Sequence, residues 1–319
     1  MKQVLEFEKP VVKLREEIED AKKKLASKPS DKLASQITEL EKKADALQRD
    51  IHTNLNPWQR VQISRHINRP FMLDYVKHCC DEFIEVHGDR HVGDDHAMPA
   101  GFAIWGGKKV VVIGHQKGRD TKENLLRNFG SAHPEGYRKA LRVMRLAEKF
   151  GLPIVTLIDT PGAFPGIGAE ERNIAEAIAF NLREMMLLRT PVVAVVIGEG
   201  GSGGALGIGI ADRVLMMENA YYSVISPEGC AAILWKHREH APEAASALKL
   251  SAQDLSQLGV IDGIVPEPLG GAHNDHETAA SSLKDAVVAA ITHLEKLPTA
   301  QLLEERYQKF RALGKHTES

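Results

Sequence analysis

The segment that most constrains this chain is the stretch from Pro191 to Met217, where a short apolar run leads into a cluster of glycines. Val192 to Ile197 is β-branched and apolar, a pattern typical of a strand that is buried on both faces. Five glycines follow between Gly198 and Gly204, and a helix of small residues is expected over Ala205 to Ile210. The sequence therefore predicts a strand, a glycine loop and a helix in direct succession.

A loop of this kind is predicted to bind negative charge with its main chain. Glycines allow sharp turns and let backbone N–H groups approach a ligand closely. The first N–H groups of a helix lack intrahelical acceptors, and the helix dipole gives them partial positive charge. The question that remains is which anion the loop receives.

Three sequence patterns fit the loop, and each implies a different chemistry. Gly198-x-Gly200-x-x-Gly203 matches the fingerprint of a dinucleotide-binding site. Gly200-x-Ser202-x-Gly204 matches the nucleophile elbow of a serine hydrolase. The third pattern is an oxyanion hole of the crotonase type, with the amides of Gly203 and Gly204 as donors. A loop so rich in glycine matches many patterns, so no single match decides.

The first two interpretations have weak support outside the loop. The segment from Gly203 to Arg213 contains Gly207 and Gly209 and is too short for a crossover helix that covers a sheet. A serine hydrolase needs an acid and then a histidine after Ser202. Such residues do follow, as they would in almost any sequence: Asp212, Asp262, His237 and His273. The hydrolase is kept as the alternative.

Composition excludes several classes of protein. With 41 basic and 43 acidic residues among 319, the net charge of -2 provides no field that would attract nucleic acid. No apolar run approaches the roughly 20 residues of a membrane helix, and the N-terminus lacks the apolar core of a signal peptide. We therefore expect a soluble, cytoplasmic protein. Cys79, Cys80 and Cys230 have neither disulfide-framework nor zinc-site spacing, so no metal is expected in this chain.

The N-terminal part is predicted to be a separate helical hairpin. Apolar residues recur at heptad spacing over residues 11 to 52, interrupted by Lys28-Pro29-Ser30. Two helices that each carry such a stripe, joined by a proline turn, favour an antiparallel pair. We assign residues 1–56 to this hairpin and 57–319 to the main domain. The basic connector from Pro57 to Pro70 is expected at the solvated surface.

The rest of the chain alternates strands and helices. The expected elements are a helix from Phe71 through Ile84, a two-stranded hairpin over Gly101 to Ile113, a helix over Pro134 to Phe150, a strand over Ile154 to Ile158, a helix from Glu170 to about Arg189, and closing helices near 277–297 and 299–312. This alternation predicts an α/β fold. The closing helices carry apolar stripes that should dock on the body or on a partner.

A second glycine-rich loop strengthens the oxyanion-hole interpretation. Asp159 to Gly166 follows the strand over Ile154 to Ile158 and precedes a helix, as the first loop does. No G-x-x-x-x-G-K-[ST] loop accompanies it, which argues against a nucleoside triphosphatase. Enolate chemistry on a thioester needs two N–H donors aimed at the developing oxyanion. Lys117 and Arg119, which flank a glycine after a buried strand, are candidates for phosphate or carboxylate contacts.

Six segments of the sequence carry recognisable motifs: Gly114 to Arg119, Pro134 to Arg142, Ile158 to Gly166, Gly198 to Leu206, Ser226 to Cys230, and Pro266 to His273. Taken together, these segments resemble one known family, the carboxyltransferase α subunits of bacterial acetyl-CoA carboxylase. The resemblance covers essentially the whole chain.

The resemblance implies a crotonase-like fold of repeated ββα units, with an N-terminal helical hairpin and C-terminal docking helices. It implies an α2β2 assembly with a zinc-ribbon β subunit, working with biotin carboxylase and the biotin carboxyl carrier protein. The implied reaction moves the carboxyl group of carboxybiotin, which is attached to the carrier protein, to acetyl-CoA. The product, malonyl-CoA, enters fatty-acid synthesis, and the β subunit is expected to hold most of the CoA.

The resemblance also suggests roles within the two loops. The amides of Gly203 and Gly204, with Gly201 beside them, are expected to polarise the ureido carbonyl of carboxybiotin. No side-chain base is required, because the ureido nitrogen of biotin could accept the proton. The residues expected to bind biotin or to shape the facing wall are Gly162, Ala163, Phe164, Gly200 and Ser202.

Overall fold

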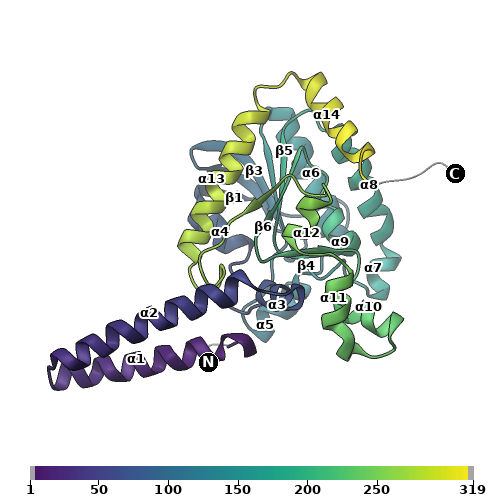
Figure 1. Cartoon of the computed structure of the whole chain (residues 1–319). Coiled ribbons are helices and arrows are strands. Elements are labelled where there is room, and N and C mark those ends of the chain that lie inside the picture. The colour runs from purple at the N-terminus through teal and green to yellow at the C-terminus, as the bar shows by residue number, and fades with distance from the viewer. Residues whose placement is uncertain (1–3, 315–319) are drawn as a thin grey trace.

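The computed structural model describes residues 4–314 and places a single sheet at the centre of the body (Figure 1). The strands are ordered β1-β2-β3-β4-β5-β6-β8, and β7 pairs with the end of β5. The first three strands are antiparallel and the others are parallel. Their bounds are β1 (Cys80–Glu85), β2 (Ala100–Trp105), β3 (Lys108–Gly114), β4 (Ile154–Thr160), β5 (Val192–Gly201), β6 (Arg213–Met217), β7 (Tyr221–Ser223) and β8 (Gly263–Val265).

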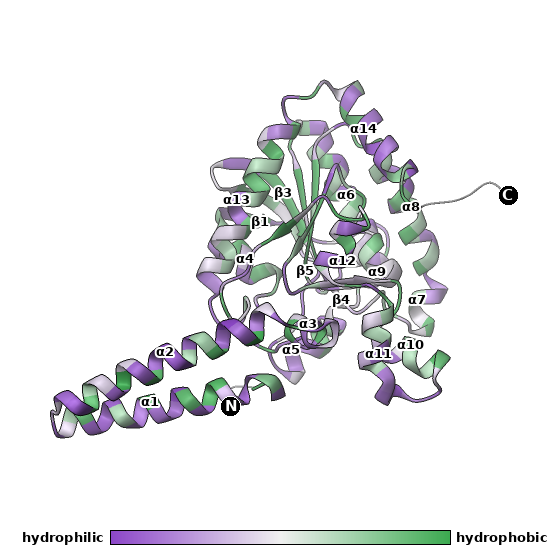
Figure 2. Cartoon of the chain, in the orientation of Figure 1, coloured by the Kyte–Doolittle hydropathy of each residue, from purple (hydrophilic) through white to green (hydrophobic). Residues whose placement is uncertain are grey.

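Helices cover both faces of this sheet. One face packs against α4 (Met72–Cys79) and α13 (His276–Leu294), and the other against α6 (Pro134–Phe150) and α8 (Ile174–Leu187), with α14 (Thr299–Arg311) against α8 (Figure 1). Every residue of β4 and β5 is buried, as their continuous apolar sequence predicts. Figure 2 shows the same distribution, with hydrophobic strands enclosed by helices that turn polar faces outward.

The shorter helical segments connect these layers. They are η1 (Glu6–Glu8), α3 (Pro57–Ser64), α5 (Thr121–Leu126), η2 (Asn128–Gly130), α7 (Ile167–Glu171), α9 (Ser202–Leu206), α10 (Pro227–Leu234), η3 (Arg238–His240), α11 (Ala241–Ala247) and α12 (Ala252–Gln257). Within residues 4–314, no helix has both the length and the apolar character that crossing a bilayer demands.

The N-terminal hairpin projects away from the body. Helices α1 (Lys9–Ser27) and α2 (Asp31–Thr53) lie antiparallel and bury Ile18, Ile37 and Ala44 between them (Figure 1). These residues belong to the heptad stripe, so the predicted hairpin is confirmed. The boundary of an independent domain at residue 56 stays a prediction.

Three helices begin or end at residues other than those expected, and the first two are shortened or interrupted. The helix that begins near Phe71 stops at Cys79, because the following residues pair with β2 as an edge strand in which Phe83 lies opposite Ala103. The helix expected from Glu170 is broken at Asn173, which has a left-handed φ of 62°. In each case tertiary pairing or a local turn overrides the apolar spacing.

The helix after the first glycine loop is also shorter than expected. It begins at Ser202 and ends at Leu206, and the strand before it extends to Gly201. Five residues make only a little more than one turn, so the dipole of α9 adds little to the charge that its amides present.

A buried arginine fastens the C-terminal helix to the body. The guanidinium of Arg306 donates to both carboxylate oxygens of Asp212, at 2.8 and 2.7 Å, and its side chain is fully buried. The same group also donates to three backbone carbonyls, those of Met185, Leu188 and Thr190. The docking expected for the closing helix is thus confirmed, with the body as its partner.

We predict that Arg306→Met lowers the free energy of unfolding by about 3–5 kcal/mol, because the carboxylate of Asp212 would stay buried without its cation. Urea denaturation followed by circular dichroism measures the change. Arg311→Met, at an exposed position of the same helix, serves as the control and should shift stability by less than about 0.5 kcal/mol. Equal stability of the two variants would contradict this account of the docking.

Candidate active site

The two glycine loops meet at one edge of the sheet. We call Thr160–Gly166 loop 1 and Gly198–Gly204 loop 2. Loop 1 begins at the last residue of β4, and loop 2 includes the last four residues of β5, its parallel neighbour. A Cβ atom on Gly201 would lie 2.2 Å from the carbonyl oxygen of Pro161, and one on Gly204 would lie 2.4 Å from the nitrogen of Ala163. Only glycine allows two backbones to approach this closely, so the sequence requirement comes from contact between the loops.

Three amides at this contact point have no protein acceptor. Within the described residues, the N–H groups of Ala163, Gly203 and Gly204 take part in no hydrogen bond. Their neighbours are engaged: the Gly162 amide donates to the hydroxyl of Thr160 at 3.1 Å, and the Phe164 amide donates to the carbonyl of Ala132 at 3.0 Å. The arrangement therefore offers free donors from both loops, which is what an oxyanion needs.

Two aromatic side chains, those of Tyr137 and Phe164, contact the loops or their neighbours. The hydroxyl of Tyr137 on α6 donates to the carbonyl of Gly204 at 3.1 Å. The Phe164 ring stacks on His133 with centroids 4.1 Å apart and leaves no room for a Cβ on Gly166. Phe164 is half-buried within loop 1, and its expected role in a biotin-facing wall stays a prediction.

Ser202 directly precedes Gly203 and Gly204 but has no catalytic partners among the described residues. It is exposed and has a positive φ of 51°, a strained geometry that it shares with nucleophile elbows. The acids and the buried histidine that would complete a triad are occupied elsewhere: Asp212 pairs with Arg306, Asp262 with Lys309, and His273 lies 3.6 Å from Glu8. The geometry does not assemble a hydrolase.

Lys117 and Arg119 are both engaged within the chain. The amine of Lys117 contacts Asp159 at 2.6 Å and Glu199 at 2.7 Å, and its side chain is only 13% exposed. Arg119 pairs with Asp74, and its guanidinium lies 3.9 Å above the ring of Phe71. Contacts of these two cations with a ligand stay a prediction.

The contacts of Lys117 with the carboxylates of Asp159 and Glu199 were not predicted from the sequence. Asp159 and Glu199 are the acidic residues that interrupt the apolar ends of β4 and β5, and this position was the available signal. The connector expected at the surface is in fact partly buried: Arg65 pairs with Glu199 at 2.6 Å, and Arg69 pairs with Glu267 at 2.6 Å. The expectation failed because the acidic partners lie far away in the sequence.

The pKa shifts follow from burial and pairing. Burial opposes the charge of Glu199, but Lys117 and Arg65 outweigh it and lower the pKa of that carboxyl to about 2. Burial also opposes the charge of Lys117, and its two carboxylate neighbours raise the pKa of the amine. For Asp159 burial wins, and the pKa of its carboxyl is raised despite Lys117.

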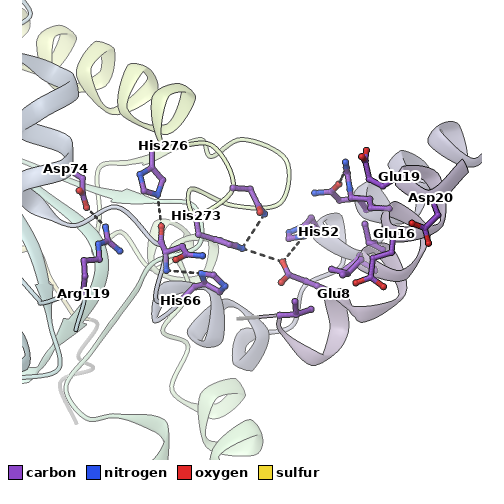
Figure 3. A pocket seen from close by; sticks show the side chains of 18 of the residues that line it. Glu8, Glu16, Glu19, Asp20, His52, His66, Asp74, Arg119, His273 and His276 are labelled. Carbon is purple, nitrogen blue, oxygen red and sulfur yellow. Dashed lines mark hydrogen bonds and ion pairs between the residues drawn. The ribbon is translucent and has the colours of Figure 1, made fainter. Parts of the chain in front are cut away.

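A large cavity lies away from the loops, at the junction of the hairpin with the body (Figure 3). Its volume is about 1100 Å³, and Glu8 lies inside it between His52 and His273, at 3.6 Å from each. Neither glycine loop lines it. In the described part of the chain, no cluster of three or more His, Cys, Asp or Glu side chains is suited to a metal ion.

Comparison with known proteins identifies close relatives of this chain. A family model described as acetyl co-enzyme A carboxylase carboxyltransferase-like matches residues 4–314. The acetyl-coenzyme A carboxylase carboxyl transferase subunit alpha of Geobacter metallireducens is 56% identical over 316 residues, which cover 98% of each protein. The protein of the same name from Thermus thermophilus is 53% identical over 314 residues, covering 98% of this chain and 99% of that relative. No serine hydrolase is implied, and the hydrolase alternative was wrong.

Solved structures share the fold at low sequence identity. Transcarboxylase 12S superposes with a TM-score of 0.57 and 18% identity, over 70% of this chain and 41% of that chain. A Pseudomonas malonate decarboxylase hetero-tetramer in complex with coenzyme A gives 0.56 and 16%, over 68% and 86%. The crotonase-like α/β fold expected from the resemblance is confirmed.

A buried histidine beneath the loops makes stability depend on pH. His115 follows β3 and is fully buried, and the backbone of Gly204 is the one neighbour that favours its charged form. Burial, with a smaller contribution from the charge of Lys117, lowers its pKa from 6.5 to about 3. The unfolded chain therefore takes up a proton below pH 6.5 that the folded chain refuses.

We predict that this difference lowers the free energy of unfolding as pH falls, by up to about 1.4 kcal/mol per pH unit between pH 6.5 and about 3. His115→Leu should remove this contribution, so that its stability falls less steeply than that of the wild type between about pH 6 and pH 5. Urea unfolding at a series of pH values measures the slopes. His237→Leu, at an exposed position, is the control and should keep the wild-type slope. Identical slopes for His115→Leu and the wild type would refute the assignment.

Proposed function

This chain belongs to the acetyl-CoA carboxylase carboxyltransferase α-subunit family, and we propose on that premise that it transfers a carboxyl group from carboxybiotin to acetyl-CoA, forming malonyl-CoA. The observation that supports this most directly is the contact of two glycine loops with free amides on both sides. We propose the cytoplasm as its location and fatty-acid synthesis as its pathway.

The proposed work of this chain is to bind and orient an oxygen that becomes negative. Carboxybiotin, attached to the carrier protein, would supply the activated carboxyl group. The amides of Gly203 and Gly204 would donate to its ureido oxygen, and the Ala163 amide on loop 1 lies close to Gly204. Gly162, Phe164, Gly200, Gly201 and Ser202 shape the same place. Each donor held ready in this way stabilises the developing charge by about 3 kcal/mol.

We propose that a zinc-ribbon β subunit covers the edge where the loops meet and holds most of acetyl-CoA. Large apolar side chains are exposed on the elements next to the loops: Ile167 at the start of α7, Leu206 on α9 and Val224 after β7, with exposed fractions of 80%, 41% and 77%. Large apolar side chains exposed beside a site are consistent with a surface that a partner covers. The α2β2 assembly, the biotin carboxyl carrier protein and biotin carboxylase belong to the same proposal.

The proposed function is tested with Gly204→Ala in the complex co-expressed with a β subunit. An added methyl group would collide with the Ala163 nitrogen and push the loops apart, so the kcat of biotin-dependent malonyl-CoA decarboxylation should fall about 100-fold or more. Gly93→Ala, where a Cβ meets nothing within 4 Å, is the matched control and should retain full activity. Near-normal turnover by folded Gly204→Ala would end the assignment of this site, and a wild-type complex without turnover would end the proposed function.

A further inference from the structure

We propose that Lys117 is a positioning residue that fixes the separation of the two glycine loops by bridging Asp159, just before loop 1, to Glu199, within loop 2. The inference rests on the proposed function, because the loops are taken to hold the reacting group. It assigns to Lys117 a task different from the ligand contact expected from the sequence.

The bridge lies at an irregularity between the two central strands. Ile158 on β4 pairs with Val196 on β5, but the next pair joins Thr160 to Gly200. One residue of β4 therefore faces three residues of β5, Ile197 to Glu199, which form a bulge that includes the first glycine of loop 2. Bulges re-aim a strand and are common beside active sites. Here the bulge decides where loop 2 lies relative to loop 1.

Buried charged side chains replace the ladder hydrogen bonds that the bulge loses. The carbonyl of Ile197 accepts from the guanidinium of Arg69 at 2.8 Å, and the amide of Glu199 donates to the Asp159 carboxylate at 2.9 Å. A backbone group buried without a partner would be costly, so these side chains make the bulge possible.

Lys117 neutralises the two carboxylates on which this arrangement depends. Its amine contacts the same Asp159 oxygen that receives the Glu199 amide, and it also contacts one oxygen of the Glu199 carboxylate. The other Glu199 oxygen receives Arg65 at 2.6 Å and the Tyr221 hydroxyl at 2.9 Å. Lys117 is the only cation paired with Asp159 among the described residues, because Arg65 is shared between Glu199 and the partly exposed Glu228. Without Lys117, one negative charge would have no counter-charge, and the carboxylates would repel each other across the loops.

Two glycines, Gly198 and Gly130, leave space for the side chains that form the bridge. A Cβ on Gly198 would lie 2.5 Å from an oxygen of Asp159, and one on Gly130 would lie 2.8 Å from the Cγ of Lys117. Glycine at these two positions therefore makes room for the ion pairs themselves. An amine enclosed in this way, with two carboxylate neighbours, has little charge left to attract a phosphate.

Lys117→Met tests the inference in the complex with the β subunit. A positioning role predicts a fall in kcat of about 100-fold, because a displacement near 1 Å is enough for that, with the KM for malonyl-CoA and for biotin changed less than about threefold. Lys309→Met is the matched control: Lys309 pairs with Asp262, and its side chain is 16% exposed, but it belongs to α14 and does not touch the loops. This variant should keep wild-type kcat after correction for the folded fraction.

A second variant separates positioning from general loss of stability. In Lys117→Met/Asp159→Asn the missing cation is matched by a missing anion, and the asparagine can still accept from the Glu199 amide while donating to its carboxylate. We expect the double variant to recover at least about tenfold in kcat over Lys117→Met. If Lys117→Met does not fold, the double variant takes its place in the test. The kcat of the double variant should then be lower than that of the wild type, and its KM values should be unchanged.

Amide hydrogen exchange gives a readout independent of turnover. Exchange over residues 159–164 and 198–204 should be faster in Lys117→Met than in the wild type, with the hairpin unaffected. Unchanged exchange with unchanged kcat overturns the inference, and so does a loss confined to KM, which would show ligand contact instead. If the wild-type complex has no transferase activity, the proposed function fails, and the exchange rates alone decide the role of Lys117.

Discussion

Two stretches of main chain lie closer together here than any side chain would permit, and the candidate site depends on that contact. Gly201 and Gly204 in loop 2 touch Pro161 and Ala163 in loop 1 directly. The parallel order of β4 and β5 brings the loops to one edge, and the bulge in β5 adjusts their offset. The free amides follow from this geometry, since backbones held this way have no room to turn toward acceptors of their own.

Several buried ion pairs of the body hold irregular backbone segments in place. Arg306 with Asp212 and Arg69 with Glu267 are buried pairs that each satisfy backbone groups as well as each other. Lys117 does the equivalent beneath the loops with two carboxylates. Buried ion pairs add little net stability compared with apolar packing, but removing one partner is costly. Their value here is that they hold irregular backbone in one conformation.

The sequence alone was sufficient to predict the features that depend on a local pattern of residues. The apolar strand before Gly198, the heptads of the hairpin and the family motifs predicted the centre of the fold and both loops. It was insufficient where the deciding partner is distant. Phe83 has the spacing of a helical residue but belongs to a strand that pairs with β2. Arg65 was expected at the solvated surface but forms an ion pair with Glu199. That Ala163 contributes a free amide beside Gly204 follows only from how β4 and β5 are packed.

The projecting hairpin has a consequence for assembly. Helix α2 has 23 residues, so the arm extends roughly 35 Å, and none of its described residues is a large hydrophobic side chain exposed to solvent. Its outer faces instead carry lysines and glutamates. A contact made through these outer faces would depend on exposed charges, so it would weaken as ionic strength rises.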